Sequence, residues 1–369
     1  MPNLLLLRLV LISLFPRALF ALFSPTSLTS RQDGPDIVHL TQTEIDAITP
    51  FSNYAAAAFC KPKSLADWSC GEPCRANKNF KLHALHGGDG NHKMTWFVGY
   101  DQDLQTIVVS HQGTARDRVR ADVTTVLCIL DNCDPRDNNC ISNCKEEHND
   151  DSEPASLKTD LNLTLTELNS PMTDNRFSAS DGSDAEAPGP GIKVHGGFLN
   201  EYLEFSRPIL SAVRDTIAQD GVHHVTVVGH SMGAALALLD SISLSLHLTN
   251  DVVIDTIAYG LPQIGNQAFA NYVDNHIKNL KRITNRQAII AAKEDYIPSL
   301  PGERLNYAQP KQGQIHIRTN GEWVRCVPGP CSRVVDNPQA PDTQDIDKLA
   351  PGIMSHIGPY DSVSLHCPG

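Results

Sequence analysis

The 369-residue chain has no Cys-x-x-Cys pair and no internal repeat, although it contains ten cysteines. The spacing that usually binds structural zinc is therefore missing, and we expect no metal site. Ten cysteines are many for a cytosolic enzyme and are typical of a chain that passes through an oxidising compartment, where they form disulfides. Spacing does not determine their pairing, although Cys70 with Cys74 and Cys326 with Cys331 could each close a short loop.

Long apolar runs are also missing, apart from one at the N-terminus. Residues 4–14 read LLLLRLVLISL, and Arg8 and Ser13 interrupt this run. A helix that spans a membrane needs about 20 apolar residues. We therefore interpret residues 1–23 as a secretory signal peptide rather than as a membrane anchor. We expect a secreted, extracellular protein with no integral membrane span.

The chain has no cluster of basic residues that would favour nucleic acid as a partner. Its net charge of −12 is concentrated in residues 131–190, where fourteen acidic residues stand against four basic ones. This stretch lacks sustained periodicity and is rich in polar residues, which predicts a long, disordered insertion. It contains the sequon Asn162-Leu163-Thr164, which predicts a glycosylated surface site.

Strand and helix patterns alternate outside this insertion. Residues 41–58 predict a helix with a capping box at Thr41 and Glu44, interrupted at Pro50. The other predicted strands are residues 94–101, 105–113, 223–229, 252–260 and 288–292, and the other predicted helices are residues 198–219, 231–246 and 266–277. Because strands and helices alternate, we predict an α/β fold with a mostly parallel central sheet flanked by helices. Residues 24–369 would form this single domain.

The segment VTVVGHSMGAALALLDS places Ser231 between a predicted strand and a predicted helix. Gly229 and Gly233 flank this serine at the two positions where side chains would clash in a sharp turn. The pattern is that of the nucleophile elbow of an α/β-hydrolase. There the backbone N–H of the next residue, Met232, points towards the reacting oxygen at a helix N-terminus. The alternative is a tight strand–helix turn in a protein that is not an enzyme.

A serine nucleophile needs a histidine base and a carboxylate that orients this base, and in α/β-hydrolases they follow in the order Ser, Asp or Glu, His. Asp295 is the favoured acid because it directly follows the predicted strand 288–292 and precedes a rigid Tyr-Ile-Pro segment. Its neighbour Glu294 is interpreted as a solvated residue. Asp255, which lies inside a predicted strand, is interpreted as structural.

Three histidines follow Asp295 in the sequence. His356 is the favoured base because it stands in MSHIGPYDS, which is read as a loop with a flexible glycine and a rigid proline. His316 lies in an alternating strand pattern, and His366 stands beside Cys367 near the end of the chain; they are the alternatives. His230, inside the elbow, is interpreted as a packing residue that points away from the nucleophile.

The chain resembles the class 3 fungal lipases, and in particular a basidiomycete branch of that family of secreted α/β-hydrolases. The similarity rests on motifs that cover most of the chain outside residues 1–40 and 131–190. They are VVSHQGT (108–114), KVHGGF (193–198), VTVVGHSMGAALALLD (225–240), YGLPQIGNQAFANYVD (259–274), KEDYIPSLPG (293–302), GEW with Cys326 and Cys331, and SHIGPY (355–360).

The resemblance implies further roles. Thr114 occupies the place of the family's oxyanion residue, with Met232 providing the second N–H. Cys60 and Cys367 match a family disulfide between an early helix and the C-terminus. In the family an Asp after the oxyanion loop and the lid supports the oxyanion residue. Both Asp122 and Asp160 could take this place here.

We therefore expect a monomeric, cofactor-free lipase that hydrolyses acylglycerols at an oil–water interface through Ser231, His356 and Asp295. A feruloyl or short-chain esterase of the same family is one alternative, and a catalytically inactive secreted binding protein on the same scaffold is another. Residues 119–156 could alternatively come from a retained intron in the gene model. The acidic insertion, if it is genuine, could block the cleft.

Overall fold

A nine-stranded mixed sheet forms the centre of the computed structural model of the protein, which describes residues 37–87, 94–115, 143, 162–168, 185–285, 295–326 and 346–367. In spatial order the strands are β1 (Ile37–His39), β11 (Trp323–Cys326), β10 (Gln314–Ile317), β9 (Asn279–Asn285), β8 (Val253–Tyr259), β7 (His224–His230), β4 (Thr106–His111), β3 (Trp96–Asp101) and β2 (Phe80–His86). The strands from β10 to β4 pair in parallel, whereas the pairs at both edges are antiparallel. The predicted α/β fold with a parallel sheet centre is confirmed.

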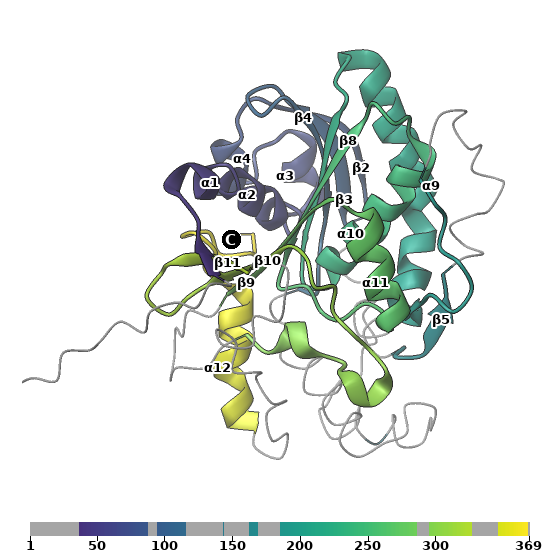
Figure 1. Ribbon diagram of the computed structural model, residues 1–369. Helices are drawn as coiled ribbons and strands as arrows, with labels where there is room; N and C mark the ends of the chain where they lie inside the picture. Colours follow the sequence, from purple (N-terminus) through teal and green to yellow (C-terminus); the bar gives the residue numbers. More distant parts are fainter. Residues whose placement is uncertain are drawn as a thin grey trace, which may run out of the picture. The chain divides into compact units, whose positions relative to one another are not determined.

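Helices cover both faces of this sheet (Figure 1). One layer consists of α9 (Gly196–Asp220), α10 (Met232–His247) and α11 (Gln267–His276). The other consists of α1 (Gln42–Asp46), α2 (Thr49–Ala57), α3 (Pro62–Ala66) and α4 (Glu72–Ala76). Helix α12 (Ile346–Ile357) and the 3-10 turns η1 (Ile297–Ser299) and η2 (Glu303–Leu305) belong to neither layer.

The central strands are apolar on both faces because each face packs against helices. Val109 and Val227 contact the α9–α11 layer, and their neighbours Val108 and Val228 contact the α1–α4 layer. Successive side chains of a strand point to opposite faces, so one Val-rich run serves two cores. Strands β7 and β8 pair in parallel with α10 between them in sequence, which is the β-α-β unit that we predicted.

The predicted capping box of the first helix is present. Thr41 Oγ1 accepts a hydrogen bond from Glu44 N, and Glu44 Oε2 accepts one from Thr41 N. The helix ends at Asp46, and α2 begins at Thr49 with Pro50 in its first turn. Proline is tolerated there because the first N–H groups of a helix have no partner within the helix. The predicted interruption therefore comes just before Pro50 and gives two helices.

Part of the stretch that we predicted to be disordered is ordered. Within residues 162–168, strand β5 (Leu165–Glu167) pairs antiparallel with β6 (Lys193–His195). Leu163 and Leu168, on either side of this strand, are buried. In the sequon Asn162 is half-buried and Thr164 is exposed.

The strand directly before the predicted acid also differs from expectation. Strand β9 (Asn279–Asn285) was not predicted, because Lys281 and Arg282 interrupt its apolar pattern. The strand predicted at residues 288–292 lies outside the described residues. So do the predicted signal peptide, Asp122, Asp160, Glu294, Cys331 and the cysteines between residues 128 and 144.

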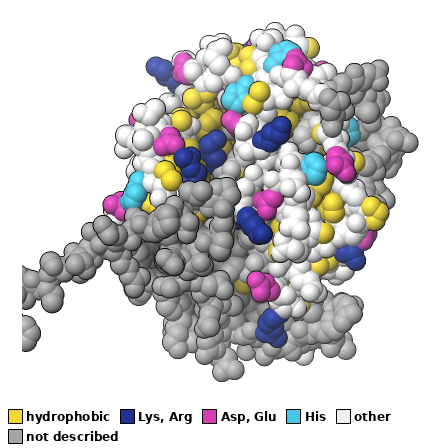
Figure 2. Space-filling view, in the orientation of Figure 1, with side chains coloured by type: hydrophobic (Ala, Val, Ile, Leu, Met, Phe, Trp, Pro, Cys, Tyr) yellow, Lys and Arg dark blue, Asp and Glu magenta, His cyan; other side chains and the backbone are white. Residues whose placement is uncertain are grey.

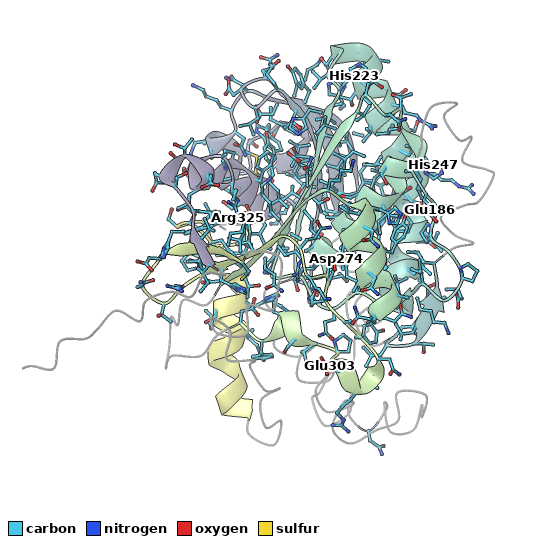
Figure 3. The ribbon with its side chains drawn as sticks, in the orientation of Figure 1. Glu186, His223, His247, Asp274, Glu303 and Arg325 are labelled. Carbon is cyan, nitrogen blue, oxygen red and sulfur yellow. A yellow bond between two sulfur atoms is a disulfide. The ribbon has the colours of Figure 1, made fainter. Side chains whose placement is uncertain are left out.

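Charged side chains of both signs are interspersed on the face of the protein that Figure 2 shows. Arg325 on β11 and Asp274 on α11 are labelled in Figure 3. Arg325 donates a hydrogen bond to Glu44 on α1, and Asp274 accepts hydrogen bonds from the backbone N–H groups of Lys311 and Gln312. Within the described part of the chain, no helix is long and apolar enough to cross a membrane.

Candidate active site

Ser231 stands at the turn between β7 and α10, and its backbone has φ 59° and ψ −127°. Residues other than glycine rarely adopt a positive φ, so the turn holds the backbone of this serine under strain. Its N–H donates to the carbonyl of Tyr259 on β8, and its own carbonyl accepts from Ala234 N. These bonds tie the strained residue to the neighbouring strand and to the first turn of the helix.

The two flanking glycines have no space for a side chain. A Cβ at Gly229 would lie 2.1 Å from the carbonyl oxygen of Gly233. One at Gly233 would lie 2.6 Å from the carbonyl oxygen of His111, at the end of β4. The elbow therefore packs backbone against backbone, as the Gly-x-Ser-x-Gly pattern predicted.

Thr114 and Met232, the predicted oxyanion donors, stand on adjacent segments. Gly113 fits against the elbow so tightly that a Cβ there would lie 2.2 Å from His230 O and 3.3 Å from Gly233 N. Thr114, which follows Gly113, is buried. Met232 is the first residue of α10, where backbone N–H groups have no acceptor within the helix. This arrangement can present donors to a developing negative charge.

The structure brings Asp295 and His356 together. His356 Nδ1 lies 3.0 Å from Asp295 Oδ2, and both side chains are fully buried. Asp295 Oδ1 accepts from Ile297 N at 3.0 Å, so both carboxylate oxygens have a partner. This carboxylate therefore favours the tautomer in which Nδ1 carries the proton and Nε2 is the acceptor. His356 Nε2 is buried and has no hydrogen-bond partner within the described part of the chain.

His356 lies in the last turn of α12 and not in a loop, which corrects our expectation. Pro351 and Gly352 made a helix improbable from the sequence, since both residues disfavour helix interiors. The pair Gly358-Pro359 ends the helix one residue after Ile357, as is usual for a helix C-terminus.

The other histidines and the other aspartate that the sequence offered for these roles have different surroundings. His316 is an internal residue of β10, and His366 stands beside Cys367, which is disulfide-bonded to Cys60. Asp255 lies near the start of β8, whereas Ser231 lies at the other end of the parallel strands, just after β7. The carboxylate of Asp255 lies 3.0 Å from His224 Nε2. This position agrees with the structural role that we expected for Asp255.

His230 has contacts that the sequence did not reveal. Its ring centroid lies 4.5 Å from that of His356, and its Nε2 donates to the backbone carbonyl of His356 at 2.8 Å. It therefore does not merely pack in the core. Burial and the nearby His356 lower the pKa of His230 well below its usual value, so its ring is neutral.

The disulfides of the described cysteines follow the sequence-based expectations. Cys60 pairs with Cys367 and Cys70 pairs with Cys74. Cys326 is also disulfide-bonded. Among the described residues, no group of three or more His, Cys, Asp or Glu side chains could hold a metal ion.

Comparison with known proteins gives one family match. The model of the class 3 lipase family matches residues 153–305, a region that contains Ser231 and Asp295 but neither Thr114 nor His356. A secreted mono- and diacylglycerol lipase, MDL2, from Malassezia globosa is 33% identical over 120 residues, which are 32% of this chain and 37% of that protein. Secreted mono- and diacylglycerol lipase 3 from Gibberella zeae is 28% identical over 179 residues, 48% of this chain and 52% of its own.

The chain thus spans about half the length or less of the curated relatives that it matches first. Among solved structures, lipase II from Rhizopus niveus superposes with a TM-score of 0.58 at 18% identity, covering 90% of this chain and 100% of that one. At this identity the likeness establishes the fold, and the fold is that of the fungal lipases.

Proposed function

We propose, from the membership of residues 153–305 in the class 3 lipase family, that the protein is a secreted hydrolase of acylglycerol esters. The family match confirms the resemblance that the motifs indicated. The single observation that carries the activity is the buried pair of His356 and Asp295 at 3.0 Å, with Nε2 of His356 making no hydrogen bond to any residue that the structure describes. A base held in this tautomer can accept a proton from a serine hydroxyl.

The nucleophile in this proposal is Ser231, on the strained turn before α10. Its Oγ attacks the ester carbonyl while His356 Nε2 takes the proton. Asp295 accepts the Nδ1 hydrogen bond and stabilises the imidazolium. His356 then protonates the leaving alcohol, and an acyl-enzyme remains on Ser231. Water that is deprotonated by His356 releases the fatty acid and restores the serine.

The tetrahedral intermediate carries an oxyanion, which Thr114 and the N–H of Met232 would bind. Gly113 and Gly233 support this role, because they bring the two segments into backbone contact. Donors fixed before the reaction stabilise charge without reorganisation, and removing one such donor typically costs about 10²–10³ in kcat. This chemistry uses groups of the chain together with one water molecule.

Acylglycerols are the proposed substrates because the relatives are named mono- and diacylglycerol lipases. We propose that the enzyme acts as a monomer outside the cell and meets its apolar substrate at an oil–water interface. The apolar N-terminal run and the described disulfides support secretion.

The experiment that tests the activity compares wild type and Ser231→Ala on emulsified triolein, diolein and monoolein, on tributyrin, and on soluble methyl ferulate. We expect wild type to release fatty acid from the oleoyl glycerols and Ser231→Ala to be inactive on all substrates. Faster turnover of methyl ferulate than of every acylglycerol would replace the lipase by a feruloyl esterase. Equal rates for the two proteins would overturn the hydrolase proposal.

We also propose that the acidic insertion is part of the mature protein and that residues 1–23 are removed. Peptide mass spectrometry of the secreted protein checks both points. The tryptic peptide EEHNDDSEPASLK, residues 146–158, would be present, and peptides from residues 1–23 would be absent. Loss of residues 119–156 from the secreted protein would instead support a retained intron.

A further inference from the structure

The C-terminal turn of α12, which carries His356, is held by side chains from the sheet. The last four carbonyl groups of a helix have no partner within the helix. At this end Asn285, the last residue of β9, donates from Nδ2 to the carbonyl of Ser355 at 3.0 Å and to that of Pro359 at 3.2 Å. One buried amide thus binds the chain on both sides of His356.

The carbonyl of His356 itself accepts two further hydrogen bonds. His230 donates from Nε2 at 2.8 Å, and Tyr360 donates from its hydroxyl at 3.1 Å. His230, Asn285 and Tyr360 are each at most 1% exposed. We call these three residues the carbonyl clamp. Since water does not reach the clamp, loss of one donor removes a hydrogen bond that solvent cannot replace.

His230 also connects the clamp to the other parts of the site. It precedes Ser231 on β7, and its carbonyl is packed against Gly113, next to Thr114. Its ring contacts that of His356 at a tilt, with the centroids 4.5 Å apart. One residue therefore contacts the segments that carry the nucleophile, the base and the oxyanion residue.

The hydrogen bond to a carbonyl defines the state of His230. A carbonyl only accepts, so Nε2 must carry a proton. Nδ1 is buried and makes no hydrogen bond in the described part of the chain, which agrees with a neutral ring. His230 is thus a fixed donor and does not compete with His356 for the proton of Ser231.

We propose that the carbonyl clamp positions the imidazole of His356 for proton transfer, and that His230 is its principal member. This inference rests on the proposed hydrolase function. The helix end cannot shift without breaking bonds to β7, β9 and Tyr360. Proton transfer requires His356 Nε2 within hydrogen-bond reach of Ser231 Oγ, and a displacement of about 1 Å can cost about 10²-fold in rate.

The test compares His230→Leu with His230→Gln, in which the amide nitrogen of glutamine can replace Nε2 as the donor. The readouts are kcat and KM for p-nitrophenyl butyrate, together with Tm. We expect His230→Leu to lower kcat about 10- to 100-fold at an unchanged KM, and His230→Gln to restore most of kcat. Tyr360→Phe keeps the ring and removes the hydroxyl, which donates to the His356 carbonyl and also interacts with Asp295, so it should lower kcat as well.

The control is Thr256→Val on β8, which removes a buried hydrogen bond of 2.7 Å to Ser241 that lies outside the clamp. Its Tm should fall while kcat stays at the wild-type value. The clamp is overturned by a folded His230→Leu with wild-type kcat, or by His230→Gln as impaired as His230→Leu. Should His230→Leu not fold, wild-type kcat in Tyr360→Phe overturns it.

Failure of the proposed function gives a different result. If wild type and Ser231→Ala are equally inactive on every ester, the hydrolase proposal fails and the inference fails with it. If wild type is active, Ser231→Ala is inactive and the clamp variants keep wild-type kcat, only the clamp fails.

Discussion

At Ser231 a strained backbone coincides with a hydroxyl that does not cap the helix that begins after it. Its φ of 59° is one that glycine adopts readily, and its hydroxyl makes no capping bond to α10 although it occupies the N-cap position. A residue kept in such a conformation costs about 1–3 kcal/mol, which the surrounding packing must offset. Backbone strain of this kind is common at functional sites.

Replacing Ser231 by glycine should therefore stabilise the protein. We expect Ser231→Gly to unfold at a higher temperature than wild type, by about 1 kcal/mol of free energy or a few degrees in Tm. Ser231→Ala loses the hydroxyl but retains the strain, so its Tm should lie below that of Ser231→Gly. Calorimetry of the three proteins checks this, and equal Tm values for the two variants would contradict the strain.

His230 should make stability depend on pH. Burial lowers its pKa well below the 6.5 of an unfolded histidine, so at mildly acidic pH the unfolded chain binds a proton that the native protein does not. The contribution of the neutral His230 to the free energy of unfolding is fully present above pH 6.5. It is lost as pH falls towards the pKa of His230 in the native state. Wild-type Tm should thus fall more steeply below pH 6.5 than that of His230→Gln. Parallel curves would refute this.

At the scale of residues, the sequence predicted what depends on local order. Ser231 was proposed from its turn, and Asp295 and His356 from the chain order that the fold requires; the structure places these last two side chains in contact. The role of His230 was not predictable, since its acceptor lies 126 positions away and belongs to a helix end. Asn285 was missed for the same reason: its two acceptors are backbone carbonyls 70 and 74 positions further on.

At the scale of elements, β9 shows how tertiary contacts override local propensity. Arg282 interrupts the apolar pattern of β9, yet its guanidinium is buried and donates to Gln312 O at 3.0 Å and Gln309 Oε1 at 3.1 Å. Burial lowers the pKa of Arg282 to about 10. These partners come from a loop after η2, and the sequence around β9 gives no sign of them.

Asn266 caps helix α11 and also binds the backbone just before β6. Asn266 Oδ1 accepts from Phe269 N at 3.0 Å, and its Nδ2 donates to Gly191 O at 2.8 Å. Asn266→Ala should lower the free energy of unfolding by about 1–2 kcal/mol. The matched control is Asn271→Ala on the exposed side of α11. Denaturant titration checks the pair, and equal losses would contradict the cap.

At the scale of the whole molecule, two disulfides close loops of very different size. Cys60 and Cys367 are 307 positions apart, whereas Cys70 and Cys74 are 4 apart. The long loop connects the segment after α2 to the end of the chain, ten residues beyond Ile357 and the end of α12. Its pairing was implied by the family resemblance, since spacing alone left the partners open.

The double variant Cys60→Ala/Cys367→Ala should therefore lose more stability than Cys70→Ala/Cys74→Ala. Loop-closure entropy grows with the logarithm of loop length, which predicts a difference of about 3–4 kcal/mol between the two. Denaturant unfolding of both variants measures it. A larger loss for the short loop would show that native-state contacts outweigh the constraint on the unfolded chain.

The central claim is that Ser231 is the nucleophile and that His356, held by Asp295, activates it. The most direct measurement is reaction with a fluorophosphonate probe, followed by peptide mapping of the adduct in wild type, His356→Ala and Ser231→Ala. The account predicts one adduct per chain on Ser231 in wild type, much slower labelling in His356→Ala and none in Ser231→Ala. Labelling of another residue, or the same rate with and without the imidazole of His356, would contradict it.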